Sequence, residues 1–209
     1  MFDIRKWDVW EATHSLLNNY TRFQSADLAE KAVTLLFQTL TWELKRVCIE
    51  GEYDNQSLKR LMKRRDQFLS TANSIIRDGA AGVENAYLCL CDMLIFFNWK
   101  VAADADVSDP LIQALPVKLD QETSNRVLSF VMDNVFVEST DPDQAMEVDS
   151  AGVGGSRGLH PDVYMQSQMT DKRRNLLGQY CKLIMHGVLP VIEAASVFTH
   201  YARVSKFDC

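Results

Sequence analysis

Apolar residues recur along most of the chain at the spacing of amphipathic helices. Between residues 26 and 50, for example, Leu28, Ala32, Leu36 and Leu40 follow one another at intervals of four. Positions three and four residues apart share one face of a helix, so this pattern predicts helices rather than strands. We expect helices over residues 3–20, 26–50, 57–76, 84–101, 122–135, 171–185 and 190–204.

Residues that favour turns and caps support several of these boundaries. Gly51 follows the second helix, and Asp78-Gly79 is a stop signal for the third, because glycine readily adopts a left-handed conformation. Asp120 precedes the fifth helix as an N-cap, and Pro190 suits the first turn of the last helix, where its missing N–H has no partner to lose. Residues 110–116 are expected to form a packed loop.

The stretch 138–156 has a different character from the rest of the chain. It contains Glu138, Asp141, Asp143, Glu147 and Asp149, no Lys or Arg, and a run of glycines at its end. Such a segment buries too little apolar surface to offset the entropy of ordering it. We therefore expect helical repeats over residues 1–137, a disordered acidic insertion over 138–160, and a C-terminal helical pair of the same array over 161–209.

The composition narrows the fold class to an all-α protein. Nine Gly and five Pro among 209 residues are few for a β-sandwich, a β-barrel or an αβ chain, all of which need many turn residues. Glu30, Ala32, Leu36 and Leu40 recur 54 residues later as Glu84, Ala86, Leu90 and Leu94. Helix pairs at such a period indicate a HEAT-like helical repeat array, an α-solenoid segment, with one irregular helical bundle as the alternative.

Charge, hydropathy and cysteine content limit the environment of the protein. The net charge of -6 excludes a uniformly basic nucleic-acid binder. The mean hydropathy is -0.14. The sequence has no uninterrupted apolar run of about 20 residues, so no membrane span is expected. Four of the five cysteines lie in apolar helical stretches, which suits a reducing compartment, and no secretory signal opens the chain. The expected location is the cytoplasm or the nucleus.

No motif for catalysis, cofactor binding or metal binding is found in the sequence. There is no glycine-rich phosphate-binding motif after a strand pattern. Cys89 and Cys91 are two apart on a helix and point about 200° from each other, so core packing explains them better than chelation. His14, His160, His186 and His200 lack metal-ligand spacing. We therefore predict a protein that is no enzyme, with no cofactor and no small-molecule substrate.

Two basic clusters stand out against the acidic total. They consist of Lys59, Arg60, Lys63, Arg64 and Arg65 in the third expected helix, and of Lys172, Arg173 and Arg174 at the start of the sixth. Like charges four residues apart repel one another, and cations at a helix N-terminus oppose the helix dipole. The clusters are candidate contacts for phosphate or an acidic partner. The alternative is a solvated outer face, partly neutralised by Asp66 and Asp171.

Several short motifs, in their order and spacing, resemble the stromalin (stromal antigen, SA) subunit of cohesin. They are Lys6-Trp7-Asp8-Val9-Trp10, Cys91-Asp92-Met93-Leu94-Ile95-Phe96-Phe97, Val131-Met132-Asp133-Asn134-Val135-Phe136-Val137, Lys172-Arg173-Arg174-Asn175-Leu176-Leu177, Tyr180-Cys181-Lys182-Leu183-Ile184 and Ala194-Ala195-Ser196-Val197-Phe198-Thr199-His200-Tyr201. The likeness covers nearly the whole chain. It departs after Tyr201, where the family continues with a Tyr-, Asn- and Asp-rich stretch.

The resemblance implies a fold and a role. The family is an all-helical HEAT-repeat hook several times longer than this chain, so the chain is similar to a segment from its later part. The implied role is a non-enzymatic scaffold that binds the kleisin subunit and the rest of the cohesin ring, helps cohesin engage DNA, and supports sister-chromatid cohesion on chromosomes in the nucleus. The alternatives from the residues alone are a helical adaptor unconnected with chromatin, and a helical enzyme with a cofactor pocket between helices.

Overall fold

A computed structural model of the 209-residue chain describes residues 9–19, 25–51, 53–98, 110–136 and 161–204. These residues form helices and turns and include no strand, which confirms the predicted all-α fold class. The helices are α1 (Val9–Asn18), α2 (Ala26–Lys45) with a π-helical extension η3 (Arg46–Glu50), α3 (Asn55–Arg77), α4 (Val83–Phe96), α6 (Pro110–Gln113), α7 (Gln121–Val135), α8 (Pro161–Met185), and the 3₁₀ turn η5 (Val191–Glu193) leading into α9 (Ala194–Val204).

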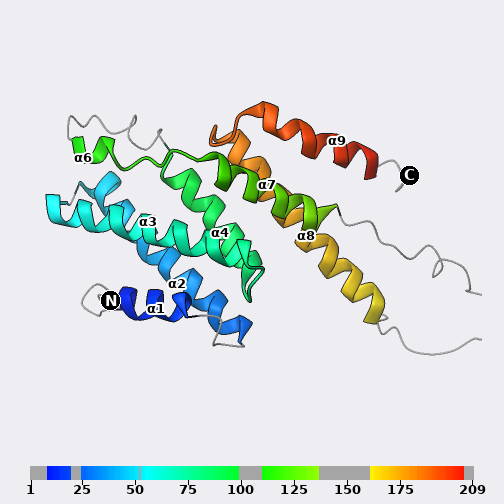
Figure 1. Ribbon diagram of the computed structural model, residues 1–209, viewed down its shortest axis with the longest axis horizontal. Coiled ribbons are helices and arrows are strands. Elements are labelled where there is room, and N and C mark those ends of the chain that lie inside the picture. The colour runs from blue at the N-terminus through cyan, green and yellow to red at the C-terminus, as the bar shows by residue number, and fades with distance from the viewer. Residues whose placement is uncertain (1–8, 20–24, 52, 99–109, 137–160, 205–209) are drawn as a thin grey trace, which may run out of the picture.

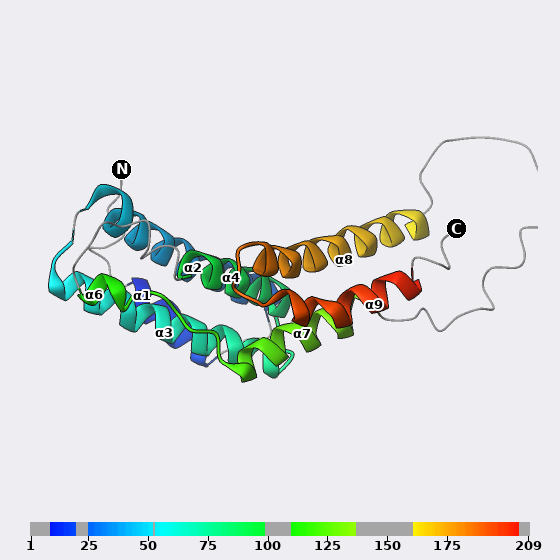
Figure 2. The same ribbon diagram turned by 90° about the horizontal axis from the view of Figure 1, so that it is seen from above.

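The long helices are arranged in two layers. Helices α2, α4 and α8 form one layer, and α1, α3, α7 and α9 form the other (Figures 1 and 2). Helix α2 packs against α1, α3 and α4, while α8 packs against α4 and α7. A stack in which each helix contacts mainly its neighbours along the chain is the arrangement of helical repeat proteins. It fits the HEAT-like array expected from the sequence.

One continuous apolar core lies between the two layers. Leu90 and Cys91 of α4 are fully buried, as expected for a helix with apolar residues on nearly every side. The ring of Tyr87 stacks on Phe130 of α7 with 4.8 Å between centroids. The Tyr87 hydroxyl donates to the carbonyl oxygen of Leu176 in α8 at 3.4 Å. The apolar members of the repeated pattern, which are Ala32, Leu36, Leu40, Ala86, Leu90 and Leu94, are all buried.

The turn between α3 and α4 packs against the first turns of α2. Gly79 has a φ of 59° and ends α3 as predicted, and Gly82 has a φ of 78°. A Cβ atom on Gly82 would lie 3.2 Å from the backbone nitrogen of Glu30. Beside it, Asn85 donates to the Glu30 carbonyl at 2.8 Å and contacts the Thr34 hydroxyl at 3.0 Å. This close approach fixes α4 against α2.

Helix caps explain two of the boundaries near the outer layer. The carboxylate of Asp120 accepts a hydrogen bond of 2.6 Å from the backbone nitrogen of Thr123, so Asp120 is the predicted N-cap of α7. Asp54 and Ser57 form a reciprocal capping box that begins α3 at Asn55, two residues before the predicted start. Because each cap satisfies backbone donors that the helix leaves open, it fixes the first residue of the helix.

Several predictions about the chain were wrong. The fourth helix ends at Phe96 rather than at residue 101, and Pro190 is extended and precedes the 3₁₀ turn instead of standing in a first turn. Helix α8 begins at Pro161 rather than at residue 171, so the cations at 172–174 lie inside the helix and do not oppose its N-terminal dipole. The ten residues before Asp171 lack the apolar stripe on which periodicity depends, whereas Pro161 is a residue that suits a first turn. Residues 110–113 form a one-turn helix within the expected loop. The expected insertion at 138–160 lies outside the described residues.

Candidate interaction surface

The structure divides the first basic cluster into buried and exposed members. Arg65 is only 7% exposed. Its guanidinium donates to the carbonyl oxygens of Leu115 and, at 3.2 Å, of Ala114, both in the segment between α6 and α7. It also pairs with Asp66 at 2.8 Å and lies 5.8 Å from the centre of the Phe97 ring. Arg65 therefore anchors the α6 segment to α3.

Arg64 also makes its contacts inside the fold. It forms an ion pair with Glu43 of α2, and both side chains are largely buried. Its guanidinium lies 5.1 Å from the centre of the Trp10 ring of α1. The other carboxylate oxygen of Glu43, Oε2, is buried and has no hydrogen-bond partner among the described residues. Arg64 thus joins three helices and is not a free surface cation.

The remaining three cations lie on the outer face of α3. Lys59, Arg60 and Lys63 are exposed. Hydrogen bonds from Ser57 hold the pKa of the Asp54 carboxylate below its ordinary value, with a smaller contribution from the charge of Arg60. Within the described part of the chain, Lys59 and Lys63 form no ion pair. Since they are four residues apart, they lie one above the other on the same face of the helix.

The second basic cluster lies on α8 and is not brought together with the first. Lys172 forms an ion pair with Glu84 in the first turn of α4, so it links two neighbouring helices of one layer. Arg174 pairs with Asp171 at 3.2 Å on the exposed face of α8, and Arg173 is half-buried. Glu84 follows the end of α3, whereas Lys59 and Lys63 lie in its first half. The two clusters are therefore separate surfaces.

An open polar groove of about 560 Å³ runs between α1 and α3, beside Lys63. His14 Nε2 and the Thr71 hydroxyl are hydrogen-bonded across it at 3.1 Å. The Trp10 indole nitrogen donates to Gln67 Oε1 at 3.1 Å. The groove is lined by His14, Asn18, Lys63, Asp66, Gln67, Ser70 and Thr71.

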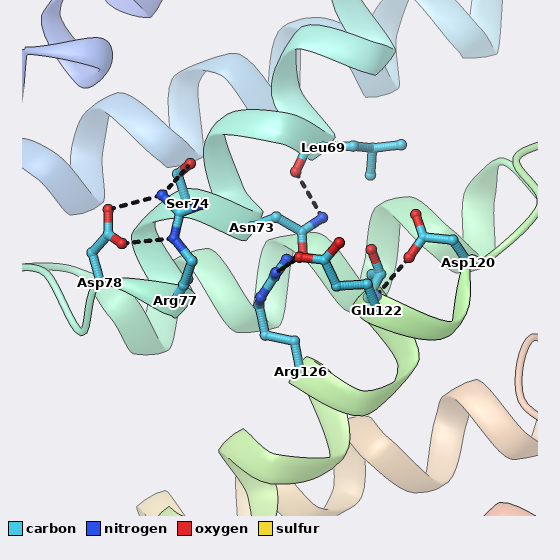
Figure 3. A network of polar contacts seen from close by, with 9 residues as sticks. Leu69, Asn73, Ser74, Arg77, Asp78, Asp120, Glu122 and Arg126 are labelled. Carbon is cyan, nitrogen blue, oxygen red and sulfur yellow. Dashed lines mark hydrogen bonds and ion pairs between the residues drawn. The ribbon is translucent and has the colours of Figure 1, made fainter.

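The next groove along the same layer, between α3 and α7, is crossed by side chains. Figure 3 shows Arg126 of α7 reaching Asn73 of α3, to whose Oδ1 it donates at 2.8 Å, while also pairing with Glu122. Asn73 in turn donates to the Leu69 carbonyl at 3.0 Å. The hollow beside these bonds, lined by α3 and by the segment that leads into α7, is smaller, about 180 Å³. The α1–α3 groove is therefore the more accessible of the two.

Sequence reasoning identified Lys63 by its charge but missed the groove. The groove depends on uncharged polar residues, Gln67, Ser70 and Thr71, which share with Lys63 the side of α3 that faces α1. Their spacing of three, one and four residues is that of a single helix face, and this was the available signal. What the sequence could not show is that α1 lies parallel to this face and supplies its other wall.

The buried thiols are poor nucleophiles. Burial raises the pKa of Cys89 to about 12, with a further contribution from Asp92, and raises that of Cys91 still further. A thiol is reactive as the thiolate, so neither group is activated at neutral pH. Among the residues that the structure describes, no group of three His, Cys, Asp or Glu side chains could hold a metal ion. None of the described helices is long and apolar enough to cross a bilayer.

These features define the class of the molecule: a two-layered helical repeat segment whose outer faces carry polar and basic side chains. No protein-family model matches the chain. It is 30% identical over 201 residues to the cohesin subunit scc-3 of Caenorhabditis elegans, an alignment that covers 95% of this chain and 16% of the relative. It is 28% identical over 206 residues to cohesin subunit SA-1 of Xenopus laevis and 27% identical over 210 residues to cohesin subunit SA-3 of Homo sapiens, each covering 96% of this chain and 15% of the relative.

The comparisons confirm the resemblance to the stromalin subunit of cohesin. Along nearly its whole length, the chain is similar to one region of these larger proteins. It spans about one sixth of the length of the relatives it matches.

Proposed function

We propose that this chain is a non-enzymatic HEAT-repeat scaffold segment of cohesin that binds the kleisin subunit and chromatin, and so supports sister-chromatid cohesion in the nucleus. The observation that carries the proposal is the similarity to cohesin subunits over 95% of the chain. In the proposed organisation, residues 1–137 and 161–209 belong to one array, separated by the acidic insertion at 138–160.

The arrangement of helices supports a scaffold role. Two layers held by one apolar core leave their outer faces open along the whole stack, and helical repeat proteins use such extended faces to bind partners. Apart from Glu43 Oε2, the buried polar side-chain atoms of the described residues have hydrogen-bond partners, as with Arg65 and the Ala114 carbonyl. In this proposal the buried cations Arg64 and Arg65 hold helices together, and only exposed groups contact partners.

The test of cohesin membership is co-purification with the kleisin subunit. The tagged 209-residue chain is expressed with the kleisin of the same organism and recovered by affinity purification. We expect the kleisin to be recovered with the chain. If it is not, the proposed kleisin contact is wrong, and a helical adaptor unconnected with cohesin is the better interpretation.

The chromatin contact is assigned to the exposed cations of α8. Lys172 and Arg174 keep 42% and 75% of their side chains exposed, so both can reach a phosphate despite their ion pairs. Replacing both with Gln is expected to weaken binding to mixed-sequence duplex DNA severalfold and to reduce the slope of affinity against salt by about one for each lost contact. The control is the double replacement of Lys31 and Lys45 with Gln on α2, which removes the same charge. Equal affinities of the two variants would contradict the assignment.

A further inference from the structure

The groove between α1 and α3 contains polar groups that the fold itself does not use. His14, Asn18 and Thr71 bond to one another. Asp66 Oδ1 pairs with Arg65, and Gln67 Oε1 accepts from Trp10. Four groups remain that bond to no residue that the structure describes: Asp66 Oδ2, the Lys63 ammonium, the Gln67 amide nitrogen and the Ser70 hydroxyl.

The mixture of donors and acceptors in this groove suits a peptide better than a nucleic acid. A peptide backbone offers one N–H donor and one carbonyl acceptor per residue, and needs both kinds of partner. The groove supplies acceptors at Asp66 and Ser70 and donors at Gln67 and Ser70. A phosphate backbone accepts hydrogen bonds only, and the Asp66 carboxylate on the groove wall would repel it.

The positive charges of Lys59 and Lys63 favour a ligand that carries negative charge. Lys63 lies at one end of the lining residues, and Lys59 is one helical turn farther along α3. Both are exposed and without an ion-pair partner among the described residues. An extended chain leaving the groove at this end passes two adjacent ammonium groups, so acidic side chains there would be stabilised.

Helix geometry gives the length of the ligand. The eight residue-to-residue steps from Lys63 to Thr71 extend about 12 Å along the axis of α3, at about 1.5 Å per step. An extended peptide rises about 3.3 Å per residue, so about four of its residues fill the groove. We propose that the α1–α3 groove binds an extended peptide segment of about four residues that is followed, on the Lys63 side, by one or two carboxylates facing Lys63 and Lys59.

This inference deepens the proposed scaffold function at one surface, and it is tested separately from cohesin membership. A phage library of random twelve-residue peptides is selected against the whole 209-residue chain. The recovered peptides are then synthesised with a fluorescent label, and their dissociation constants are measured by anisotropy. We expect recovered sequences rich in Asp and Glu next to a short uncharged stretch.

Two variants test the two halves of the site. Lys63→Glu reverses the charge, and Ser70→Trp fills the groove; each is expected to weaken the binding of the selected peptides at least tenfold. Lys31→Glu, on α2 in the other layer, makes the same charge change and is expected to leave binding unchanged. Circular dichroism at 222 nm checks that every variant keeps its helix content.

Several results would overturn the proposal. They are the absence of any selected peptide, selected peptides without acidic residues, or equal binding to the wild-type chain and both groove variants. If no peptide is recovered and Lys63→Glu instead weakens duplex DNA binding, the surface is a nucleic-acid contact. Recovery of the kleisin with the chain is a separate measurement and is not decided by any of these outcomes.

Discussion

Asn98 donates a hydrogen bond of 2.7 Å from Nδ2 to the carbonyl oxygen of His186, 88 residues away in the sequence. Asn98 follows the end of α4, and His186 lies in the turn after α8, so the bond joins two helices of one layer at their adjoining ends. Farther along the same pair, Gln179 of α8 donates to Asp92 of α4. Direct polar bonds thus align α8 with α4 in addition to their apolar contact.

Replacing Asn98 with Ala should destabilise the protein. The side chain is only 7% exposed, and its loss removes a donor from a carbonyl that is partly shielded from water. We expect the free energy of unfolding to fall by about 1–3 kcal/mol, measured by urea denaturation. The control is Asn125→Ala on the exposed face of α7, which should change it by less than about 0.5 kcal/mol. Equal effects would show that the Asn98 bond has no special role.

Arg65 and Lys59 should respond differently to the same substitution. Arg65→Met removes charged hydrogen bonds to two carbonyl oxygens of the segment before α7, and should cost about 2–3 kcal/mol of unfolding free energy. Lys59→Met changes an exposed side chain and should stay within about 0.5 kcal/mol. Urea denaturation of the two variants in parallel provides the comparison. A stable Arg65→Met variant would mean that Arg65 does not anchor the α6 segment.

The Arg64–Glu43 pair should behave as a coupled buried pair. Arg64→Met leaves the Glu43 carboxylate buried without its partner and should cost about 3 kcal/mol or more. The double variant Arg64→Met with Glu43→Leu removes both charges and should be more stable than Arg64→Met alone. A double-mutant cycle by chemical denaturation measures this coupling. Strictly additive effects would contradict it.

Stability should decline at alkaline pH because buried thiols and phenols resist ionisation in the folded chain. Burial raises the pKa of Cys89 and of Tyr180 to about 12, and raises those of Cys91 and Tyr87 further. The unfolded chain therefore releases protons first, so the free energy of unfolding is level below about pH 8.5 and falls as the pH rises toward 12.

A variant tests the contribution of one thiol to this decline. Cys89→Ser removes one ionisable group, and its free energy of unfolding should fall less steeply than that of the wild-type chain above about pH 9. The measurement is urea denaturation at a series of pH values. Parallel curves for the two proteins would show that Cys89 is as accessible to hydroxide in the folded chain as in the unfolded one.

Much of the fold could be predicted because most helices carry a regular apolar stripe, and some of them begin or end at an identifiable cap. Asp120 and Gly79 marked boundaries that the structure confirms. The start of α8 could not be found in this way, since the residues from Pro161 to Thr170 have no clear apolar face. The helix at these residues is an N-terminal extension of the strongly periodic part of α8, where Leu176, Tyr180 and Leu183 are buried.

The candidate site could be predicted only in part. Charge alone identified the cluster at residues 59–65, but charge does not distinguish Lys63 from Arg64, its neighbour in the sequence. Their different surroundings follow from tertiary packing: Arg64 meets Glu43 and Trp10 from two other helices, whereas Lys63 faces outward. The groove beside Lys63 needs α1 as its second wall, which no local pattern in α3 reveals.

Gly82 lies where the start of α4 closely approaches the start of α2. Its backbone lies so close to Glu30 that a methyl group would act as a wedge between the start of α2 and the start of α4. Because α8 packs on α4, a small change of angle at this point would be carried outward to helices that never touch Gly82. A partner that binds across several helices, as proposed above, would therefore depend on an alignment to which a residue without a side chain contributes.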